Sequence, residues 1–482
     1  MSENKVNKIL FVGSEATPFA ATGGLGDVLG SLPAALKKAG GEGLDIRVVI
    51  PLYTSISDEI RKDFEKVCEF TVNLSWRQQY CGVYKYDKDG VTYYFIDNEY
   101  YFKRSLMYGS FDDGERYAYF CKAVLEMMPH IGYFPDVLHA HDWQSALSVI
   151  YLKRKYRYFK EYSEIKTVYT IHNIEYQGIY GFEILSDVFC LDSWDRYIVE
   201  YDGCINLTKG AIVCCDKLTT VSPNYANEIQ TEYYSHGLHY ILAMNRDKIT
   251  GIVNGIDYDY YNPETDPEIR RHFSADNQIQ KAVDKTELQG IFGLPERKDV
   301  PVIAMISRLA SHKGFDLVKR MLEEIVTYLD VQFVLLGTGE TELEDYFSYM
   351  AAKYPDRVGV KLAFNKSLAK QIYAGADIFL MPSKSEPCGL AQMIASRYGT
   401  VAVVRETGGL YDTIKPYNPE DKTGNGITFN TYNAHDMYDA VKRATDLYKN
   451  KRQWKAIRTN AMNTDFSWNS SAEKYLEMYN NL

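Results

Sequence analysis

Apolar runs alternate with amphipathic segments along the whole chain. Continuous runs rich in Val and Ile predict buried strands in the first half, at Ile9–Val12, Ile46–Ile50, Val137–Ala140, Thr167–Ile171 and Leu218–Val221. Between them, apolar residues recur at helical spacing, as in the helix predicted over Asp27–Lys38. The segment Phe70–Asp97 differs, because polar and apolar residues flank an Asp-Lys-Asp-Gly turn, which predicts antiparallel hairpins.

The second half repeats the alternation with more strongly apolar strands. These are predicted within Val300–Arg308, Val331–Gly337, Val358–Phe364, Ala376–Pro382 and Val401–Glu406. Strands that are apolar on both sides belong to parallel sheets with helices on both faces. The pattern therefore predicts an α/β protein with two doubly wound, Rossmann-like domains.

The polar segment Tyr261–Lys285 contains two prolines and is a candidate for the crossing between the domains. We expect an N-terminal domain over residues 1–255 and a C-terminal domain over 256–465. A final helix within 466–482 is expected to return to the N-terminal domain. Ligands of such sheets bind at the carboxyl ends of the strands, so a cleft in which the two domains face each other is the expected site.

Composition narrows the classes of partner. The chain has 482 residues and a net charge of −10, which argues against nucleic acid, since phosphate backbones need a concentrated basic surface. No apolar run reaches the length of a membrane span. The eight cysteines form no CxxC pair, and the first eight residues are polar. These features predict reduced thiols, no signal peptide and a cytoplasmic location.

A glycine-rich turn follows the first predicted strand, in the segment "SEATPFAATGGLGDVLG" (Ser14–Gly30). Glycines between a strand and a helix can bring backbone N–H groups up to an anion, although they can equally serve packing. The spacing does not fit a GxGxxG dinucleotide motif. No Lys or Arg occurs from Ser14 to Ala35, and Asp27 could simply cap the helix.

Charged and glycine-rich segments also follow strands in the second half. Arg308 and Lys313 follow one strand and suit a diphosphate, although a solvated loop is an alternative. Glu386 lies in "SEPCGL", where its carboxylate could accept hydrogen bonds from sugar hydroxyls. A second "TGGL" at Thr407–Leu410 repeats the first at Thr22–Leu25, and this repetition argues against packing alone.

The segment "HAHDW" contains His139, His141 and Asp142, which could suggest a metal site. Alternation along a strand places the two histidines on one face and Asp142 on the other, and no further ligand cluster is visible. Packing at the strand end is therefore favoured over metal binding.

Together these segments closely resemble the ADP-glucose-type bacterial glycogen synthases and plant starch synthases, which are GT-B glycosyltransferases. The resemblance covers the chain from Lys8 to Tyr479 and rests on long motifs in the same order. They are "TGGLGDV", "HAHDW", "TIHNIEYQG", "TTVSPNYANEI", "NGIDYDYYNP", "SRLASHKGFDL", "EPCGL" and "RYGTVAVVRETGGLYDT".

The resemblance implies transfer of glucose from ADP-glucose to the non-reducing 4-hydroxyl of an α-1,4-glucan, with retention of configuration and without metal or other cofactor. It implies catalytic roles for Arg308, Lys313, Glu386 and His172. It implies donor binding by Thr22, Gly23, Gly24, Leu25, Asp27, Asp142, Asn173, Asn254, Cys388, Gly389, Leu390, Thr407, Gly408 and Gly409. Tyr108 and Tyr176 are expected on the acceptor side.

One departure from the family pattern bears on activity. The family normally has a lysine before "TGGL", and this chain has Ala21. Lys384 is a conceivable substitute for the missing charge. Ala21 alone motivates a second hypothesis, a weakly active or inactive paralogue that binds glucan. A related retaining transferase or phosphorylase acting on another donor is a third hypothesis, but the sequence offers no motif for the pyridoxal phosphate lysine that a phosphorylase needs.

Overall fold

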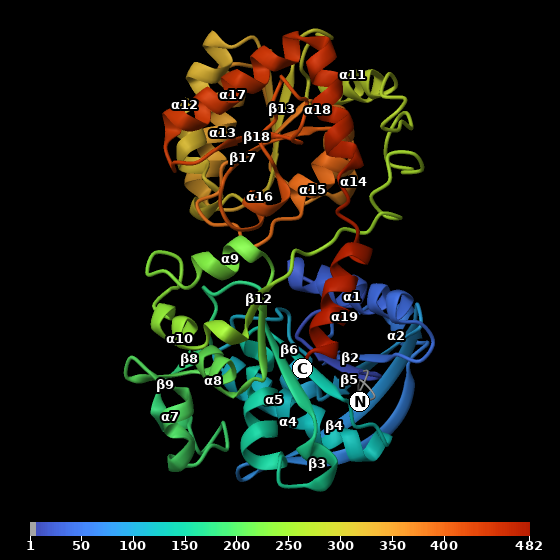
Figure 1. The fold of residues 1–482 in the computed structure, drawn as a ribbon, viewed down its shortest axis with the longest axis vertical. Helices are drawn as coiled ribbons and strands as arrows, with labels where there is room; N and C mark the ends of the chain where they lie inside the picture. The colour runs from blue at the N-terminus through green and yellow to red at the C-terminus, as the bar shows by residue number, and fades with distance from the viewer. Residues whose placement is uncertain (1–5) are drawn as a thin grey trace. The chain divides into compact units, whose positions relative to one another are not determined.

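The structure is a computed structural model that describes residues 6–482 (Figure 1). The first five residues, part of the polar N-terminus used above to predict location, lie outside the described residues. The chain divides into two compact units. Unit 1 comprises residues 1–255 and 468–482, and unit 2 comprises residues 256–467. The polar segment Tyr261–Lys285 therefore belongs to unit 2, and the chain crosses earlier than that segment suggested, directly after Gly255.

Unit 1 is built on a nine-stranded sheet of order β12-β11-β7-β6-β1-β2-β5-β4-β3. Its strands are β1 (Lys8–Val12), β2 (Asp45–Pro51), β3 (Glu65–Leu74), β4 (Arg77–Lys88), β5 (Val91–Asp97), β6 (Val137–His141), β7 (Lys166–Ile171), β11 (Lys217–Thr220) and β12 (Ile249–Gly251). The expected hairpins β3-β4-β5 extend this sheet, because β5 pairs in parallel with β2. A small separate sheet contains β8 (Ile179–Tyr180), β9 (Glu200–Tyr201) and β10 (Cys204–Asn206).

Helices surround the sheet of unit 1. They are α1 (Gly24–Gly40), α2 (Asp58–Arg61), α3 (Glu99–Phe102), α4 (Asp113–Ile131), α5 (Trp143–Tyr151), α6 (Lys160–Ser163), α7 (Arg196–Val199), α8 (Leu207–Cys214), α9 (Pro223–Glu228), α10 (His239–Met244) and α19 (Trp468–Asn480). The C-terminal helix α19 packs beside α1 (Figure 1). The Ser471 hydroxyl also donates to the carbonyl of Val253, at 2.7 Å, so the end of the chain is tied to the unit that contains its beginning.

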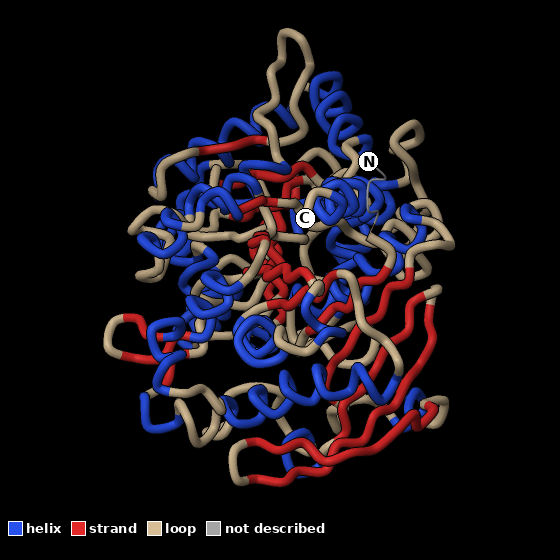
Figure 2. The backbone as a smooth tube through the Cα atoms, turned by 60° about the horizontal axis from the view of Figure 1, so that its bottom comes forward, coloured by secondary structure: helices blue, strands red, loops and turns tan. Residues whose placement is uncertain are grey.

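Unit 2 is built on a six-stranded sheet that is parallel throughout, of order β15-β14-β13-β16-β17-β18. Its strands are β13 (Val302–Ile306), β14 (Gln332–Leu336), β15 (Val358–Lys361), β16 (Ile378–Met381), β17 (Val401–Arg405) and β18 (Ile427–Phe429). Its helices are α11 (Lys281–Ile291), α12 (Phe315–Tyr328), α13 (Thr341–Lys353), α14 (Lys366–Gly375), α15 (Ala391–Arg397), α16 (Gly408–Thr413), α17 (Ala434–Lys449) and α18 (Lys451–Asn463). Figure 2 shows the strands of both units in red among blue helices.

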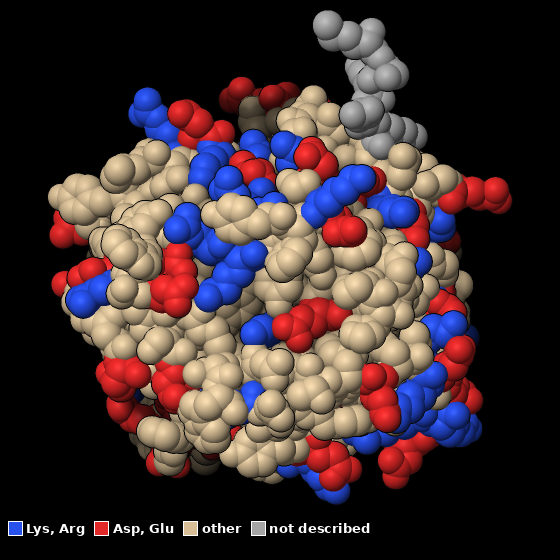
Figure 3. All heavy atoms as spheres, turned by 90° about the horizontal axis from the view of Figure 1, so that it is seen from below, with Lys and Arg blue, Asp and Glu red and all other residues tan. Residues whose placement is uncertain are grey.

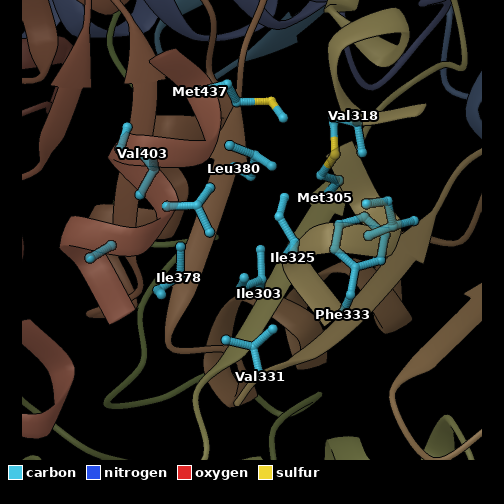
Figure 4. Packing of buried hydrophobic residues seen from close by; sticks show 14 of the residues in the cluster. Ile303, Met305, Val318, Ile325, Val331, Phe333, Ile378, Leu380, Val403 and Met437 are labelled. Carbon is cyan, nitrogen blue, oxygen red and sulfur yellow. The ribbon is translucent and has the colours of Figure 1, made fainter. Parts of the chain in front are cut away.

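The core of unit 2 shows why the second half reads as strongly apolar. Ile303 and Met305 of β13, Phe333 of β14 and Leu380 of β16 are buried and meet Val318 and Ile325 of α12 (Figure 4). A parallel sheet covered on both faces leaves its strands no polar side, so the alternating pattern of a half-exposed strand is absent from these segments. On the face shown in Figure 3, by contrast, basic and acidic side chains lie interspersed.

Candidate active site

The candidate site residues lie at the carboxyl ends of parallel strands in each unit. In unit 1 they follow β1, β6, β7 and β12, except Tyr108, which lies between α3 and α4, and in unit 2 they follow β13, β16 and β17. Parallel strands in one sheet end at the same edge, which brings residues far apart in sequence to one side of each unit.

The glycine turn of unit 1 is held by Glu15, which the sequence reasoning missed. Its buried carboxylate accepts hydrogen bonds from the backbone N–H groups of Thr22 (2.6 Å) and Gly23 (3.2 Å). It also accepts from the hydroxyls of Thr22 (2.7 Å) and Tyr108 (2.6 Å). All four donors are neutral, and Glu15 forms no ion pair with any residue in the range 6–482. The turn therefore keeps a buried carboxylate next to the exposed Ala21.

The glycines of this turn have different surroundings. A Cβ added at Gly23 or Gly24 would meet nothing within 4 Å among the described residues, whereas at Gly26 it would run into Ala21. Gly23 precedes α1 and Gly24 is its first residue, and both residues are exposed. The N–H of Gly23 donates to Glu15, which leaves the N–H of Gly24 as the donor at the exposed helix start. That arrangement can bind an anion. Leu25 is buried, and Asp27 is exposed in the first turn of α1.

Asp142 and His172 contact each other across two neighbouring strands. The backbone N–H of His172 donates to Oδ1 of Asp142 at 2.7 Å. Asp142 has φ 57° and ψ 177°, a region that residues other than glycine adopt only under strain. Burial raises the pKa of Asp142 to about 7 and lowers the pKa of His172 to about 3. The imidazole of His172 is therefore neutral near pH 7.

Three further predicted residues of unit 1 lie near these contacts or beyond them, and the backbone N–H of Asn173 also interacts with the Asp142 carboxylate. The amide oxygen of Asn173 accepts from the backbone N–H of Glu175, at 3.0 Å, and so shapes its own turn. Tyr176 is about half exposed, at 51%. Asn254 is buried, and its Oδ1 has no hydrogen-bond partner among residues 6–482.

In unit 2 the structure brings Lys313 and Glu386 together. Nζ of Lys313 lies 2.9 Å from Oε1 and 2.7 Å from Oε2 of Glu386, and the hydroxyl of Ser383 donates to Oε2 at 3.0 Å. Glu386 is 6% exposed. Arg308 has an exposed side chain that makes no hydrogen bond or ion pair with the part of the chain that the structure describes. Two cations therefore follow β13: Lys313, which is paired with Glu386, and Arg308, whose guanidinium is exposed.

The second glycine turn packs against the loop of Glu386. A Cβ at Gly408, whose φ is 44°, would overlap the carbonyl oxygen of Glu386, and one at Gly409 would overlap that of Cys388. The N–H of Gly409 donates to the carbonyls of Glu386 and Pro387, both at 3.1 Å. These glycines, which follow Thr407 before α16, therefore serve close packing.

The loop of Glu386 continues into the start of α15. Gly389 has φ 72° and Leu390 precedes the helix, while Cys388 is buried. Gln392, which sequence reasoning did not select, donates to the carbonyls of Cys388 (3.1 Å) and Gly389 (2.9 Å).

Arg405 at the end of β17 was also missed. Its guanidinium donates to the carbonyls of Ser383 (3.3 Å) and Lys384 (2.8 Å). The sequence feature that could have indicated a role for Arg405 is its position, at the end of the apolar run Val401–Val404 and just before the glycine turn.

Comparisons with known proteins follow this division of the chain. Residues 8–244 match the family described as "Starch synthase catalytic domain", and residues 289–461 match "Glycosyl transferases group 1". Over 479 residues the chain is 49% identical to a glycogen synthase of Geobacillus thermodenitrificans, covering 98% of both chains. The chain belongs to the glycogen synthase family. It is therefore a glycosyltransferase, and the family resemblance seen in its motifs is confirmed.

Other relatives and solved structures agree with this assignment. A glycogen synthase of Bacillus anthracis is 47% identical over 478 residues, covering 98% of this chain and 99% of that one. The catalytic domain of starch synthase IV from Arabidopsis thaliana, bound to ADP and acarbose, superposes with a TM-score of 0.90 at 32% identity, covering 99% of each chain. The predicted GT-B fold with two Rossmann-like domains is thereby confirmed. Within residues 6–482, no helix is long and apolar enough to cross a bilayer.

Proposed function

We propose that this glycogen synthase family member transfers glucose from ADP-glucose to the non-reducing 4-hydroxyl of an α-1,4-glucan, with retention of configuration. One observation carries the proposal: the Lys313–Glu386 ion pair lies at the strand ends of unit 2, where the exposed Arg308 has no partner among residues 6–482. Two cations placed in this way suit a leaving nucleoside diphosphate. The solved relative that carries ADP and acarbose supports this choice of ligands.

The proposed chemistry takes place on one face of the transferred glucose. The bond between C1 and the phosphate oxygen breaks while the acceptor 4-hydroxyl oxygen bonds to C1, and the acceptor proton moves to the departing phosphate oxygen. Arg308 and Lys313 stabilise the negative charge on that phosphate. Both oxygens of Glu386 are engaged by Lys313, so this carboxylate is suited to position Lys313 and sugar hydroxyls rather than to attack C1.

We assign the remaining roles as follows. In unit 1, the exposed backbone at Gly23 and Gly24, with the N–H of Gly24 as donor, binds ADP-glucose together with Thr22, Asp142 and Asn254, and Tyr108 and Tyr176 contact the glucan. In unit 2, the turn at Cys388–Leu390 and the turn at Thr407–Gly409 shape the donor site. No metal or other cofactor takes part in this scheme, and the reaction is assigned to the cytoplasm.

Incorporation of labelled glucose into glycogen tests the proposal. The purified protein is given ADP-glucose or UDP-glucose with a glycogen primer, and Lys313→Met serves as the inactive control. We expect incorporation from ADP-glucose that exceeds incorporation from UDP-glucose, with α-configured product. Absence of incorporation from both donors would contradict the proposed function, and a preference for UDP-glucose would contradict the proposed donor.

A further inference from the structure

Three histidine rings lie in a row on β6 and just beyond β7. The ring centroids of His139 and His141 are 4.2 Å apart and stacked, and those of His141 and His172 are 5.2 Å apart. Of the three, the family resemblance implies a catalytic role for His172 alone. The other two rings are fully buried and have no assigned role.

His139 and His141 are held in fixed orientations. Nδ1 of His139 lies 2.6 Å from the hydroxyl of Tyr479 in α19, and its Nε2 lies 2.6 Å from the hydroxyl of Thr170. The ring of Phe11 stacks against His141, with centroids 5.6 Å apart. His141 is therefore packed on two sides and has little freedom to rotate.

The two ring nitrogens of His141 differ in their hydrogen bonding. Its Nδ1 lies 2.9 Å from Nε2 of His172. Its Nε2 is buried and has no hydrogen-bond partner among residues 6–482. Burial lowers the pKa of both rings, so each carries one proton, and the proton positions are set by the contact between them.

Two neutral arrangements satisfy that contact. If Nε2 of His172 donates, His141 must carry its proton on the buried Nε2, where an N–H donor has no acceptor. If Nδ1 of His141 donates, the buried Nε2 is a bare lone pair and His172 carries its proton on Nδ1. Buried donors without acceptors are the rarer and costlier defect in proteins, so the second arrangement is favoured.

We propose that His141 is a positioning residue that fixes His172 with its proton on Nδ1, so that His172 presents an N–H donor to an oxygen atom of the substrate. Nδ1 of His172 makes no hydrogen bond within the described part of the chain, and the ring is only partly buried. His172 then donates a hydrogen bond to an oxygen atom of the substrate and does not remove a proton from it. This inference rests on the proposed function for the identity of the substrate but not for the position of the proton.

Nitrogen NMR of the ligand-free wild-type protein tests the proton position directly. The nine histidines are labelled with ¹⁵N, and the signals of His172 are identified by their loss in His172→Gln. We expect Nδ1 of His172 to be protonated and Nε2 to be bare near neutral pH. A proton on Nε2 would overturn the proposal. Because no substrate is present, this result is independent of whether the proposed reaction occurs.

Two variants of His141 test the positioning role. His141→Leu removes the donor, and we expect kcat/KM to fall about tenfold, as for loss of one hydrogen bond. In the same variant, the His172 signals are expected to shift towards a mixture of tautomers. His141→Asn offers an amide N–H near the place of Nδ1, and it should recover most of the loss. Equal activity of the Leu and Asn variants, at matched Tm, would contradict the role. If the Leu variant does not fold, the nitrogen NMR spectrum of the wild-type protein still tests whether the proton of His172 lies on Nδ1.

Discussion

Thr22–Leu25 in unit 1 and Thr407–Leu410 in unit 2 share the sequence TGGL, and each lies at the start of a helix that follows a strand. Their surroundings differ. Side chains added at Gly23 and Gly24 would enter open space, whereas side chains added at Gly408 and Gly409 would overlap the backbone of the Glu386 loop. In unit 1 the turn is held by hydrogen bonds from its backbone to the carboxylate of Glu15, a residue that precedes the turn in sequence.

The comparison shows that one short sequence serves two purposes. In unit 2 the glycines let two loops approach closely, and this contact holds the loop of Glu386. In unit 1 the missing side chains leave the backbone at Gly23 and Gly24 exposed, with the N–H of Gly24 at the helix start, a geometry that suits an anionic ligand. The repetition of TGGL argued against packing alone, and for the second turn that argument is wrong, because Gly408 and Gly409 pack against the loop of Glu386.

The largest expected effect concerns the ion pair that the packed turn supports. Lys313→Met should lower kcat/KM about 1000-fold, because a charge that stabilises the departing diphosphate is lost. It should also lower the free energy of unfolding by about 3 kcal/mol, since Glu386 is left buried without its partner. Adding Glu386→Gln should restore stability but not activity. Recovery of activity in the double variant would contradict the assigned role of Lys313.

The packing role of the second turn is tested by Gly409→Ala. The added methyl group would overlap the carbonyl of Cys388, and we expect the free energy of unfolding to fall by about 3 kcal/mol. Gly290→Ala is the matched control in unit 2, because a Cβ at this exposed helical position meets nothing within 4 Å among the described residues. Chemical denaturation should separate the two variants clearly. Equal stability would remove the distinction between the turns.

Glu15→Gln tests how the first turn is held. Gln has one acceptor oxygen where four donors converge, and its NH₂ group would face some of those donors. We expect a loss of about 2 kcal/mol in the free energy of unfolding, as for hydrogen bonds to a charged group. Glu42→Gln, at an exposed position, is the control and should be neutral. If both variants are equally stable, the carboxylate does not hold the turn.

Ala21→Lys has the smallest expected effect. A lysine at this exposed position would place a cation beside the open turn and the carboxylate of Glu15. We expect kcat/KM for ADP-glucose to rise by up to about tenfold, in line with one charge-assisted hydrogen bond. Steady-state kinetics of the two proteins measures this. A lower kcat/KM would show that the native turn does not lack a useful cation.

Most of the fold follows from local patterns in the sequence. The ten predicted buried strands all correspond to strands of the structure, because fully apolar runs are sufficient to identify the inside of a parallel sheet. The pairing of β5 with β2 could not be predicted, since it joins hairpins to a parallel strand distant in sequence. The division after Gly255 falls where the domain boundary was placed, whereas the polar segment Tyr261–Lys285, the candidate for the crossing, lies within unit 2.

The candidate site was predicted less completely. Charged residues after apolar strands, such as Lys313 and Glu386, are visible in the sequence, and their contact follows from the strand order. Glu15 and Arg405 were missed because their roles depend on donors and carbonyls supplied by other loops. The open or packed surroundings of a glycine are likewise decided by neighbours in space.

The most direct test of the central claim, that the first turn serves a ligand and the second serves packing, is the steady-state kinetics of Gly24→Ala. Alanine suits the first position of α1, so we predict an unchanged or slightly higher Tm. The added methyl group would obstruct the approach of the donor to the backbone, so kcat/KM for ADP-glucose should fall about tenfold or more, a loss comparable to one charge-assisted hydrogen bond. Wild-type kcat/KM in a fully stable Gly24→Ala protein would contradict the claim.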